Sequence, residues 1–264
     1  MMADFDTIRL TVLGSRGSMP VTGADTLRFG GDTSCYLLEA GEETLILDAG
    51  TGLAGARLPK DGPVHILLSH THVDHILGLP MFSALLQPGR DVRLYGRTRD
   101  GMRLEEQLSR LLSPPLWPVG LSEYPARVSC HELPEALQLG AFAIDGMEAE
   151  HPGGCTVLRV KARGKTVVYA TDFGHSEAKI RELTAFSRGA DLLLYDAQFL
   201  ESELGRKGGY GHSTAEAGGR VWRDSGAKRL LLIHHDPKQT DEMLLRREAE
   251  LGLRFARQGE VIAL

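Results

Sequence analysis

The chain of 264 residues has little cysteine and no long hydrophobic run. Its three cysteines, Cys35, Cys130 and Cys155, are an odd number at no spacing that suits a metal, so we expect no disulfide framework. A reduced, cytoplasmic compartment fits this composition best. The longest apolar runs are strand-sized, such as the one from Leu230 to Ile233. They fall far short of the roughly 20 residues that a membrane helix needs, so we expect no membrane partner.

An excess of positive charge is also lacking. The formal net charge is −5, which leaves no general basic surface to hold a long nucleic acid. A large RNA is therefore not the expected partner. The content of 42% hydrophobic and 25% charged residues is ordinary for a globular domain and excludes a disordered spacer.

Short apolar segments flanked by Gly, Pro or Asp predict strands, and several longer segments have helical periodicity. The expected strands are Thr7–Leu13, Ser34–Glu39, Thr44–Asp48, Val64–Ser69, Val92–Tyr95, Thr156–Val160, Thr166–Ala170, Asp191–Tyr195 and Arg229–His234. The expected helices are Ile76–Leu86, Met102–Leu112, Ser176–Ser187, Ala215–Ser225 and Thr240–Leu251. Because no Gly/Ser/Pro-rich linker divides the chain, we expect a single α/β domain over residues 1–264.

Residues 88–125 depart from this regularity. They carry six arginines and then a proline-rich run at 113–118. One interpretation is a solvated helix with a rigid loop, since nearby acids offset much of the charge. The other is an insertion that faces the substrate and supplies one or two arginines to an anionic ligand. If the substrate of such an insertion were a nucleotide, Trp117 or Tyr124 would be available to stack on its nucleobase.

The strongest chemical signal is the run Ser69-His70-Thr71-His72-Val73-Asp74-His75, directly after an expected strand. Alternate side chains of an extended backbone share a face, so His70, His72 and Asp74 point the same way. His75 comes beside Asp74 if a helix begins there. Imidazole and carboxylate ligands without a thiolate suit zinc, and also manganese or iron. We therefore predict a metal site at the end of this strand.

Other histidines and aspartates also lie at the ends of expected strands. His151 precedes the turn at 152–154, Asp172 and His234 close apolar strands, and His212 lies just before a helix. Polar residues at the ends of strands converge in open α/β sites. Four ligands on one loop cannot complete two coordination spheres, so we expect some of these residues to join them.

At these positions the chain resembles the metallo-β-lactamase-fold hydrolases, in the branch of tRNA 3′-endonuclease (RNase Z) and the phosphonate-pathway cyclic phosphodiesterase. The His-x-His-x-Asp-His run is specific to the superfamily, and Gly211-His212-Ser213-Thr214 narrows the resemblance to the phosphodiesterase branch. The run from Leu45 to Gly52 resembles the strand and turn before the metal loop. The resemblance covers nearly the whole chain. It implies a four-layer αββα sandwich, with the site where the strand ends of the two sheets meet.

The resemblance further implies that seven histidines and aspartates bind two divalent ions, with zinc expected and manganese or iron as alternatives. The residues for the first ion are His70, His72 and His151, those for the second are Asp74, His75 and His234, and the bridging residue is Asp172. His235 is the alternative to His234. Asp48 would orient a ligand imidazole.

A histidine–carboxylate pair is implied as well. RNase Z pairs the histidine of its Gly-His-Ser-Thr-like element with a Glu, and here Asp196, a shorter acid, aligns with that Glu. Asp196 would orient His212, which would donate a proton to the leaving alkoxide. Asp74 would ligate the second ion and accept a proton from a water activated by the two metals. The alternative for His212 is that it only packs against the following helix.

These residues predict a metal-dependent hydrolase that cleaves a phosphodiester. RNase Z carries a long Gly-rich basic arm that grips tRNA, and no such arm occurs between Thr171 and Gly211. We therefore expect a small substrate, such as a cyclic nucleotide or a cyclic phosphate. The alternatives are tRNA 3′-end processing and a thiolester or lactone hydrolase, which would not need His212. Dimers are common among such proteins, so a homodimer is a further hypothesis.

Overall fold

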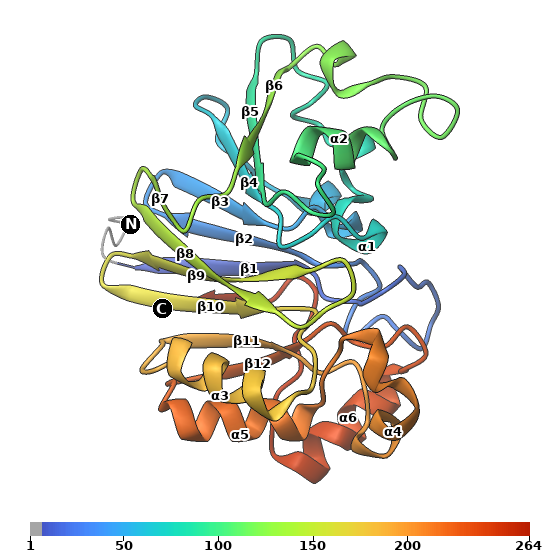
Figure 1. Ribbon diagram of the computed structural model, residues 1–264, viewed down its shortest axis with the longest axis vertical. Helices are drawn as coiled ribbons and strands as arrows, with labels where there is room; N and C mark the ends of the chain where they lie inside the picture. Colours follow the sequence, from blue (N-terminus) through green and yellow to red (C-terminus); the bar gives the residue numbers. More distant parts are fainter. Residues whose placement is uncertain (1–6) are drawn as a thin grey trace.

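Two β-sheets lie face to face at the centre of the computed structural model, which describes residues 7–264 (Figure 1). The first sheet has the order β13 (Val261–Ala263), β1 (Ile8–Gly14), β2 (Cys35–Ala40), β3 (Glu43–Leu47), β4 (Val64–Leu67), β5 (Asp91–Gly96) and β6 (Arg127–Glu132). The second has the order β12 (Leu230–Ile233), β11 (Leu192–Asp196), β10 (Lys165–Ala170), β9 (Cys155–Ala162), β8 (Phe142–Ala149) and β7 (Ala136–Leu139). Strands β3 to β6 run parallel, as do β10 to β12.

Alternating side chains of the strands bury both faces of each sheet. In β3, Leu45 and Leu47 pack between the sheets, whereas Ile46 packs on the outer face beneath the helices. The second sheet does the same in β11, where Leu192 and Leu194 face inward and Leu193 faces outward. The sandwich therefore has one core between the sheets and one core outside each of them.

Helices cover the two outer faces. Figure 1 shows α3 (Glu177–Phe186), α5 (Ala215–Ser225) and α6 (Asp241–Leu251) against the second sheet. The short helices α1 (Val73–Ile76) and α2 (Leu104–Ser109) lie over the first sheet. A further short helix, α4 (Leu204–Lys207), follows β11. The predicted four-layer αββα sandwich is confirmed.

The start and end of α5 follow from local sequence chemistry. The Thr214 hydroxyl accepts a hydrogen bond from the Ala217 amide at 3.2 Å and so caps the first turn. The helix ends at Gly226, whose φ of 67° is a conformation that glycine adopts at little cost. The expected helix at Ala215–Ser225 is therefore found with the same bounds.

The expected helix at Ile76–Leu86 is wrong. Helix α1 ends at Ile76 and only a 3-10 turn, Leu79–Met81, follows. Gly78 approaches the loop after β3 so closely that a Cβ there would lie 2.1 Å from the Gly50 carbonyl oxygen, and Pro80 offers no amide hydrogen. The chain therefore turns away from helical geometry at this point.

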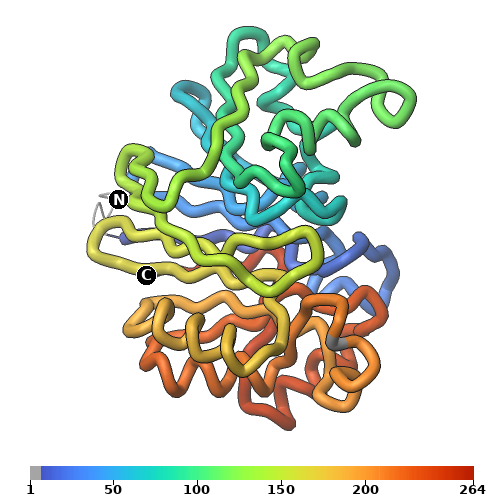
Figure 2. Tube along the Cα trace, in the orientation of Figure 1, coloured from blue at the N-terminus to red at the C-terminus, as the bar shows by residue number. Residues whose placement is uncertain are grey.

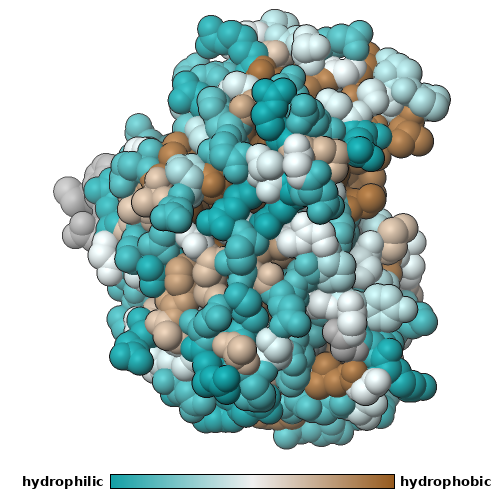
Figure 3. All heavy atoms as spheres, in the orientation of Figure 1, coloured by the Kyte–Doolittle hydropathy of each residue, from teal (hydrophilic) through white to brown (hydrophobic). Residues whose placement is uncertain are grey.

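The segment at 88–125 is only partly outside the sheets, because β5 lies within it and pairs with both β4 and β6. Residues 97–125, which include α2, form the part that projects beyond the first sheet, shown in green in Figure 2. The face drawn in Figure 3 is mostly hydrophilic, with a small hydrophobic group at the upper right, where Figure 1 places the loop after α2. Among residues 7–264, no helix combines the length and apolarity that crossing a bilayer would require.

Candidate metal centre

Loops from both sheets bring the histidines and aspartates together at one edge of the sandwich. The loop after β4 and the first turn of α1 carry four of them, and the other residues follow β8, β10, β11 and β12. The residues concerned are His70, His72, Asp74, His75, His151, Asp172, His212 and His234. All of them except His72 and His151 are buried. The convergence expected from strand ends is thus present in the structure.

This cluster contains three groups of potential ligands, of which the third, Asp172, His212 and His234, shares residues with the other two. In the first group, His70, His72, His151 and Asp172 each place a ligand atom within 4.8 Å of the others. In the second group, one atom from each of three residues meets the same limit, and the residues are Asp74, His75 and His234. Together the first two groups contain the seven residues that the resemblance implies as ligands, and which of them bind metal stays a prediction.

Asp172 lies between the two groups. Its Oδ1 is 3.7 Å from His70 Nε2 and 3.6 Å from His151 Nε2. Its Oδ2 faces the second group, at 3.0 Å from His75 Nε2 and 3.2 Å from His234 Nε2. One carboxylate therefore presents an oxygen to each group, which is the arrangement that a bridging ligand requires.

The buried carboxylates make this centre attractive to cations. Burial alone would raise the pKa of Asp172, but His234, His75 and His70 outweigh it and hold that pKa well below its ordinary value. Burial likewise opposes charge on His234, yet Asp172, Asp74 and Asp196 raise its pKa to about 9. These three buried carboxylates thus demand positive charge, supplied either by protonated histidines or by metal ions.

Two histidine nitrogens fit a metal better than any protein partner. His70 Nε2 and His75 Nε2 are buried and make no well-aligned hydrogen bond among the described residues, although both face the Asp172 carboxylate at 3.7 and 3.0 Å. His75 Nδ1 lies 2.7 Å from Asp48 Oδ2, and because a carboxylate can only accept, Nδ1 carries a hydrogen; the neutral ring would therefore present its Nε2 lone pair to a metal. The donor set of imidazoles and carboxylates therefore suits zinc, manganese or iron.

Backbone strain is concentrated at the same place. Asp48, Asp172 and His234 have φ values of 57°, 48° and 60°, in the left-handed region that non-glycine residues rarely adopt. Strain of this kind clusters at functional sites, where the surrounding structure holds it. These three residues turn the chain sharply at the ends of β3, β10 and β12, which aims their side chains into the cluster.

His212 forms a pair with Asp196 beside the metal-ligand groups. His212 Nδ1 lies 2.9 Å from Asp196 Oδ2, and the Asp196 carboxylate also accepts hydrogen bonds from the amides of Phe173 and Gln198. Because Asp196 is fully buried and fixed on both oxygens, it holds the His212 ring in one orientation. A hollow of about 390 Å³ next to this ring is lined by His72, Asp74, Asp172, His212 and others.

Two further residues, Ser18 and Gln198, belong to this network, and no sequence motif indicated a role for them. The Ser18 amide donates a hydrogen bond of 2.6 Å to Asp74 Oδ2, and Gln198 Nε2 donates one of 3.1 Å to the Ser18 hydroxyl. Ser18 has a φ of 63°, so this loop after β1 is strained as well. Its composition of Gly, Ser and Arg after a strand was the only sequence signal.

His235, the alternative to His234, points away from the cluster. Its Nε2 lies 2.8 Å from the Ala256 carbonyl oxygen, and burial lowers its pKa to about 3. The ring packs edge-on against Phe29 and Phe255. His235 is therefore a neutral core histidine, and His234 is the one whose Nε2 reaches both aspartates.

Comparison with known proteins agrees with this geometry. A family model described as the beta-lactamase superfamily domain matches residues 43–235, which span the whole cluster. The chain belongs to the beta-lactamase superfamily. The probable metallo-hydrolase YhfI of Bacillus subtilis is 27% identical over 237 residues, covering 86% of each chain. A protein named Ribonuclease Z from Metallosphaera sedula is 26% identical, covering 79% of this chain and 85% of its own.

Solved structures place this superfamily member in the metallo-β-lactamase fold. The crystal structure of YhfI aligns with a TM-score of 0.73 and 23% identity, covering 98% of this chain and 100% of YhfI. A diphosphatase from the PhnP family aligns with a TM-score of 0.71 and 21% identity over 97% of each chain. The protein is thus a metallo-β-lactamase-superfamily hydrolase whose His/Asp clusters could bind metal.

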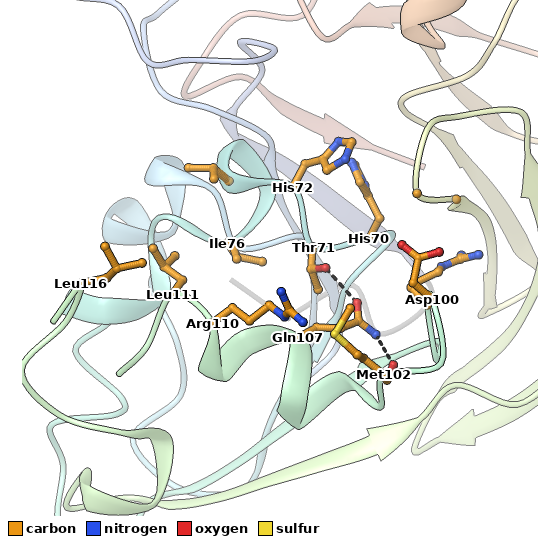
Figure 4. A pocket seen from close by; sticks show the side chains of 14 residues that line it. His70, Thr71, His72, Ile76, Asp100, Met102, Gln107, Arg110, Leu111 and Leu116 are labelled. Carbon is orange, nitrogen blue, oxygen red and sulfur yellow. Dashed lines mark hydrogen bonds between the residues drawn. The ribbon is translucent and has the colours of Figure 1, made fainter. Parts of the chain in front are cut away.

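A cavity of about 330 Å³ adjoins the first ligand group of this hydrolase (Figure 4). His70 and His72 form one wall, and residues of the segment 97–116 form another. Gln107 joins the two walls, because Thr71 Oγ1 donates a 2.8 Å hydrogen bond to its Oε1. Its amide group donates to the carbonyls of Arg97 and Met102 at 2.9 and 2.8 Å. Part of this segment thus lines a cavity beside the ligand group, and its role toward a substrate stays a prediction.

Trp117 and Tyr124 do not face the cavity, contrary to the stacking hypothesis. Trp117 Nε1 donates a 2.8 Å hydrogen bond to the Tyr124 hydroxyl, which donates in turn to the Pro80 carbonyl at 2.9 Å. Both rings pack with the core outside the first sheet. Their polar atoms are paired within the protein, so these aromatic residues stabilise the projecting segment.

Proposed function

We propose that this hydrolase cleaves a small phosphodiester, such as a cyclic nucleotide or a cyclic phosphate, with two divalent metal ions, zinc being expected. The residues that would hold the ions are His70, His72 and His151 for one, Asp74, His75 and His234 for the other, and Asp172 between them. Bound there, the ions would lower the pKa of a water between them and polarise the phosphoryl group. The other steps fall to residues of the protein.

The pairing of His212 with Asp196 carries this proposal. Cleavage of an alkyl phosphodiester releases an alkoxide as the leaving group. Expelling this alkoxide is costly unless it receives a proton. As the water oxygen bonds to phosphorus and the phosphorus–oxygen bond to the alkoxide breaks, His212 would give that alkoxide its proton. The 2.9 Å contact with Asp196 holds His212 ready for this, at the edge of the hollow that Asp74 and Asp172 also line. An ester with a good leaving group would not need such a pair.

Asp74 would take the proton of the attacking water. Its Oδ2 lies 3.3 Å from His75 Nε2 and 3.2 Å from His234 Nε2 and accepts the Ser18 amide hydrogen bond. Burial would raise its pKa, but His75 and His234 lower it well below its ordinary value. The Asp74 carboxylate is therefore ionised at neutral pH and can accept a proton, as a weak base.

Similarity to phosphoester-cleaving proteins supports the same chemistry. The relative from Metallosphaera sedula is named Ribonuclease Z, and one structural neighbour is called a diphosphatase. The relative also favours a second candidate, RNA 3′-end processing. The cavity volume of about 330 Å³ is at the small end for small-molecule sites, and the net charge of −5 disfavours a long RNA. We therefore place the small phosphodiester first and RNA second.

The test compares substrates whose leaving groups differ. Hydrolysis of 2′,3′- and 3′,5′-cyclic nucleotides would be measured beside bis(p-nitrophenyl) phosphate, with and without a chelator. Removal of a general acid costs about 10²–10⁴ in rate, so His212→Ala should slow cyclic-nucleotide hydrolysis by that factor. It should affect bis(p-nitrophenyl) phosphate much less, since p-nitrophenolate leaves without a proton. His131→Ala, an exposed histidine on β6, is the matched control.

Two results would overturn the proposal. If the protein binds metals and hydrolyses thiolesters or lactones but no phosphodiester, the reaction class is wrong. If a precursor tRNA is cleaved and the cyclic substrates are not, RNA processing takes its place. If His212→Ala slowed the hydrolysis of both kinds of phosphodiester equally, His212 would not be the general acid.

A further inference from the structure

The cavity beside His70 and His72 has a composition that the proposed chemistry leaves unexplained. Its lining is predominantly apolar, and the apolar side chains are Val73, Ile76, Met102, Leu111 and Leu116. Leu116 and Val73 are also among the most exposed large hydrophobic residues of the described chain, at 67% and 49%. Apolar side chains contribute nothing to the binding of a phosphate group by a cluster of histidines and aspartates. They suit the organic part of a substrate whose phosphate lies at the metal-ligand groups.

Arg110 supplies a free cation to this cavity. It ends helix α2, and its guanidinium makes no ion pair or hydrogen bond within residues 7–264. Arg99, which also lines the cavity, differs in this respect, because it donates to Glu148 at 2.6 Å and to Thr156 at 2.6 Å. The Arg110 guanidinium is therefore the one of the two that is available to a ligand.

Asp100 supplies a free anion to the same cavity. It lies in the loop before α2 with a φ of 49°, and no cation of the described chain pairs with its carboxylate. Figure 4 shows Asp100 and Arg110 on opposite sides of Thr71 and Gln107, with Leu111 and Leu116 beyond Arg110. A ligand in this cavity thus meets a hydrogen-bond donor on one side, an acceptor on the other, and apolar surface around them.

This combination selects among ligand classes. An alkyl chain would leave both charged groups unpaired, and a second phosphate would be repelled by Asp100. A flat heteroaromatic ring with both acceptor and donor atoms on its edge satisfies all three features. A guanidinium can donate in its plane to ring nitrogens or stack on the ring face, and a carboxylate accepts from an amino group.

We infer that this cavity binds a nucleobase, with Arg110 and Asp100 as the residues that read its edge. The inference rests on the proposed function and narrows it to nucleotide phosphodiesters. Adenine has both kinds of edge group, since its N7 is an acceptor and its amino group a donor. Arg110 and Asp100 then determine specificity and take no part in the chemical step.

The experiment compares a substrate that carries a base with one that does not. KM and kcat would be measured for 2′,3′-cyclic AMP and for methyl riboside 2,3-cyclic phosphate, in the wild type, Arg110→Gln and Asp100→Asn. Asn tolerates the left-handed backbone at position 100. Each variant should raise KM for cyclic AMP about tenfold, the effect of losing roughly one good hydrogen bond. The ratio of the KM for cyclic AMP to the KM for methyl riboside 2,3-cyclic phosphate should rise by the same factor.

Arg103→Gln removes a positive charge just before α2 but outside the cavity, and it should leave this ratio unchanged. Equal KM changes for both substrates, or none, would overturn the assignment while leaving the phosphodiesterase proposal intact. If neither the wild type nor any variant hydrolyses either substrate, the proposed function fails, independently of the nucleobase site. Equilibrium binding of adenosine to the wild type and to Arg110→Gln, measured by calorimetry, then decides: about tenfold weaker binding in the variant supports the base site, and equal or absent binding overturns it.

Discussion

Replacing Asp48 by Asn isolates the role of one buried carboxylate. Asp48 has a φ of 57°, which Asn tolerates nearly as well as Asp, so the backbone is matched. The carboxylate accepts four hydrogen bonds: from the Ser69 amide at 2.7 Å, the Ser69 hydroxyl at 2.8 Å, His75 Nδ1 at 2.7 Å and the Tyr169 hydroxyl at 2.6 Å. Asn keeps one oxygen acceptor and replaces the other with a donor.

Either orientation of the Asn side chain leaves a donor opposed to a donor. If the amide nitrogen takes the place of Oδ1, the buried Ser69 amide loses its acceptor. If it takes the place of Oδ2, it faces the Nδ1 hydrogen of His75, and this ring relaxes only by moving its hydrogen to Nε2. An unpaired buried donor costs about 1–3 kcal/mol, and bonds to a charged acceptor contribute about 1.5–3 kcal/mol. We expect Asp48→Asn to lower the free energy of unfolding by about 3 kcal/mol.

The variant should also weaken metal binding, because a hydrogen on His75 Nε2 occupies the lone pair that faces the second ligand group. Loss of such an orienting partner typically costs 10–100-fold in affinity. Denaturant unfolding of the protein after metal removal by a chelator gives the free energy of unfolding. Competition with a chromophoric chelator gives the affinity for the metal. Asp191→Asn, which removes the acceptor of Lys228 and Thr166 far from the site, is the control. If both variants lose stability and neither loses metal affinity, Asp48 only supports the core and our interpretation is wrong.

Two further predictions concern other buried groups. Gln107→Leu should lower the free energy of unfolding by about 2 kcal/mol and also reduce metal affinity, because Thr71 loses its partner; unchanged metal affinity in chelator competition would contradict the second part. Burial and then Glu105 raise the pKa of Cys130 to about 12, and burial raises those of Cys35 and Cys155 well above their ordinary value. The native protein at pH 8 should therefore react slowly with iodoacetamide, faster as pH rises and at three thiols once unfolded; rapid native labelling would refute this.

The parts of the fold and site that the sequence predicted correctly depend on local patterns. Strand alternation and the capping Thr214 locate β10, β11 and α5 to within a residue or two, because burial and hydrogen bonding there involve near neighbours. The cluster at 70–75 is likewise local. Strand-end reasoning brought the more distant histidines to the same edge, since parallel strands end on the same side of a sheet.

The parts it missed depend on contacts between distant residues. β8 includes an Asp, a Gly and a Glu and has little apolar alternation, yet it pairs with β9 from Ala143 to Ala149. The helix expected at Ile76–Leu86 was wrong because Gly78 must fit against the loop after β3, which no property of the segment itself reveals. The Ser18 contact with Asp74 spans 56 residues and is made by a backbone amide, so side-chain chemistry could not indicate it.

The same limit applies to what holds the first ligand group together. His70 and His72 belong to the first sheet and His151 to the second, so their spacing depends on contacts across the sandwich. The Thr156 amide donates to the Ser69 carbonyl at 2.9 Å, and two arginines of the loop after β5, Arg97 and Arg99, pair with Glu148 on β8, three residues before His151.

Gln107 ties that arginine loop to Thr71, between the two histidines of the first sheet. Part of the segment that forms the cavity wall is therefore also the connection between the two halves of the first ligand group. Substitution of Arg99 or Gln107 should therefore disturb the ligand spacing as well as the cavity. Arg110 and Asp100 line the same cavity but make no such contacts, so they can change the choice of substrate alone.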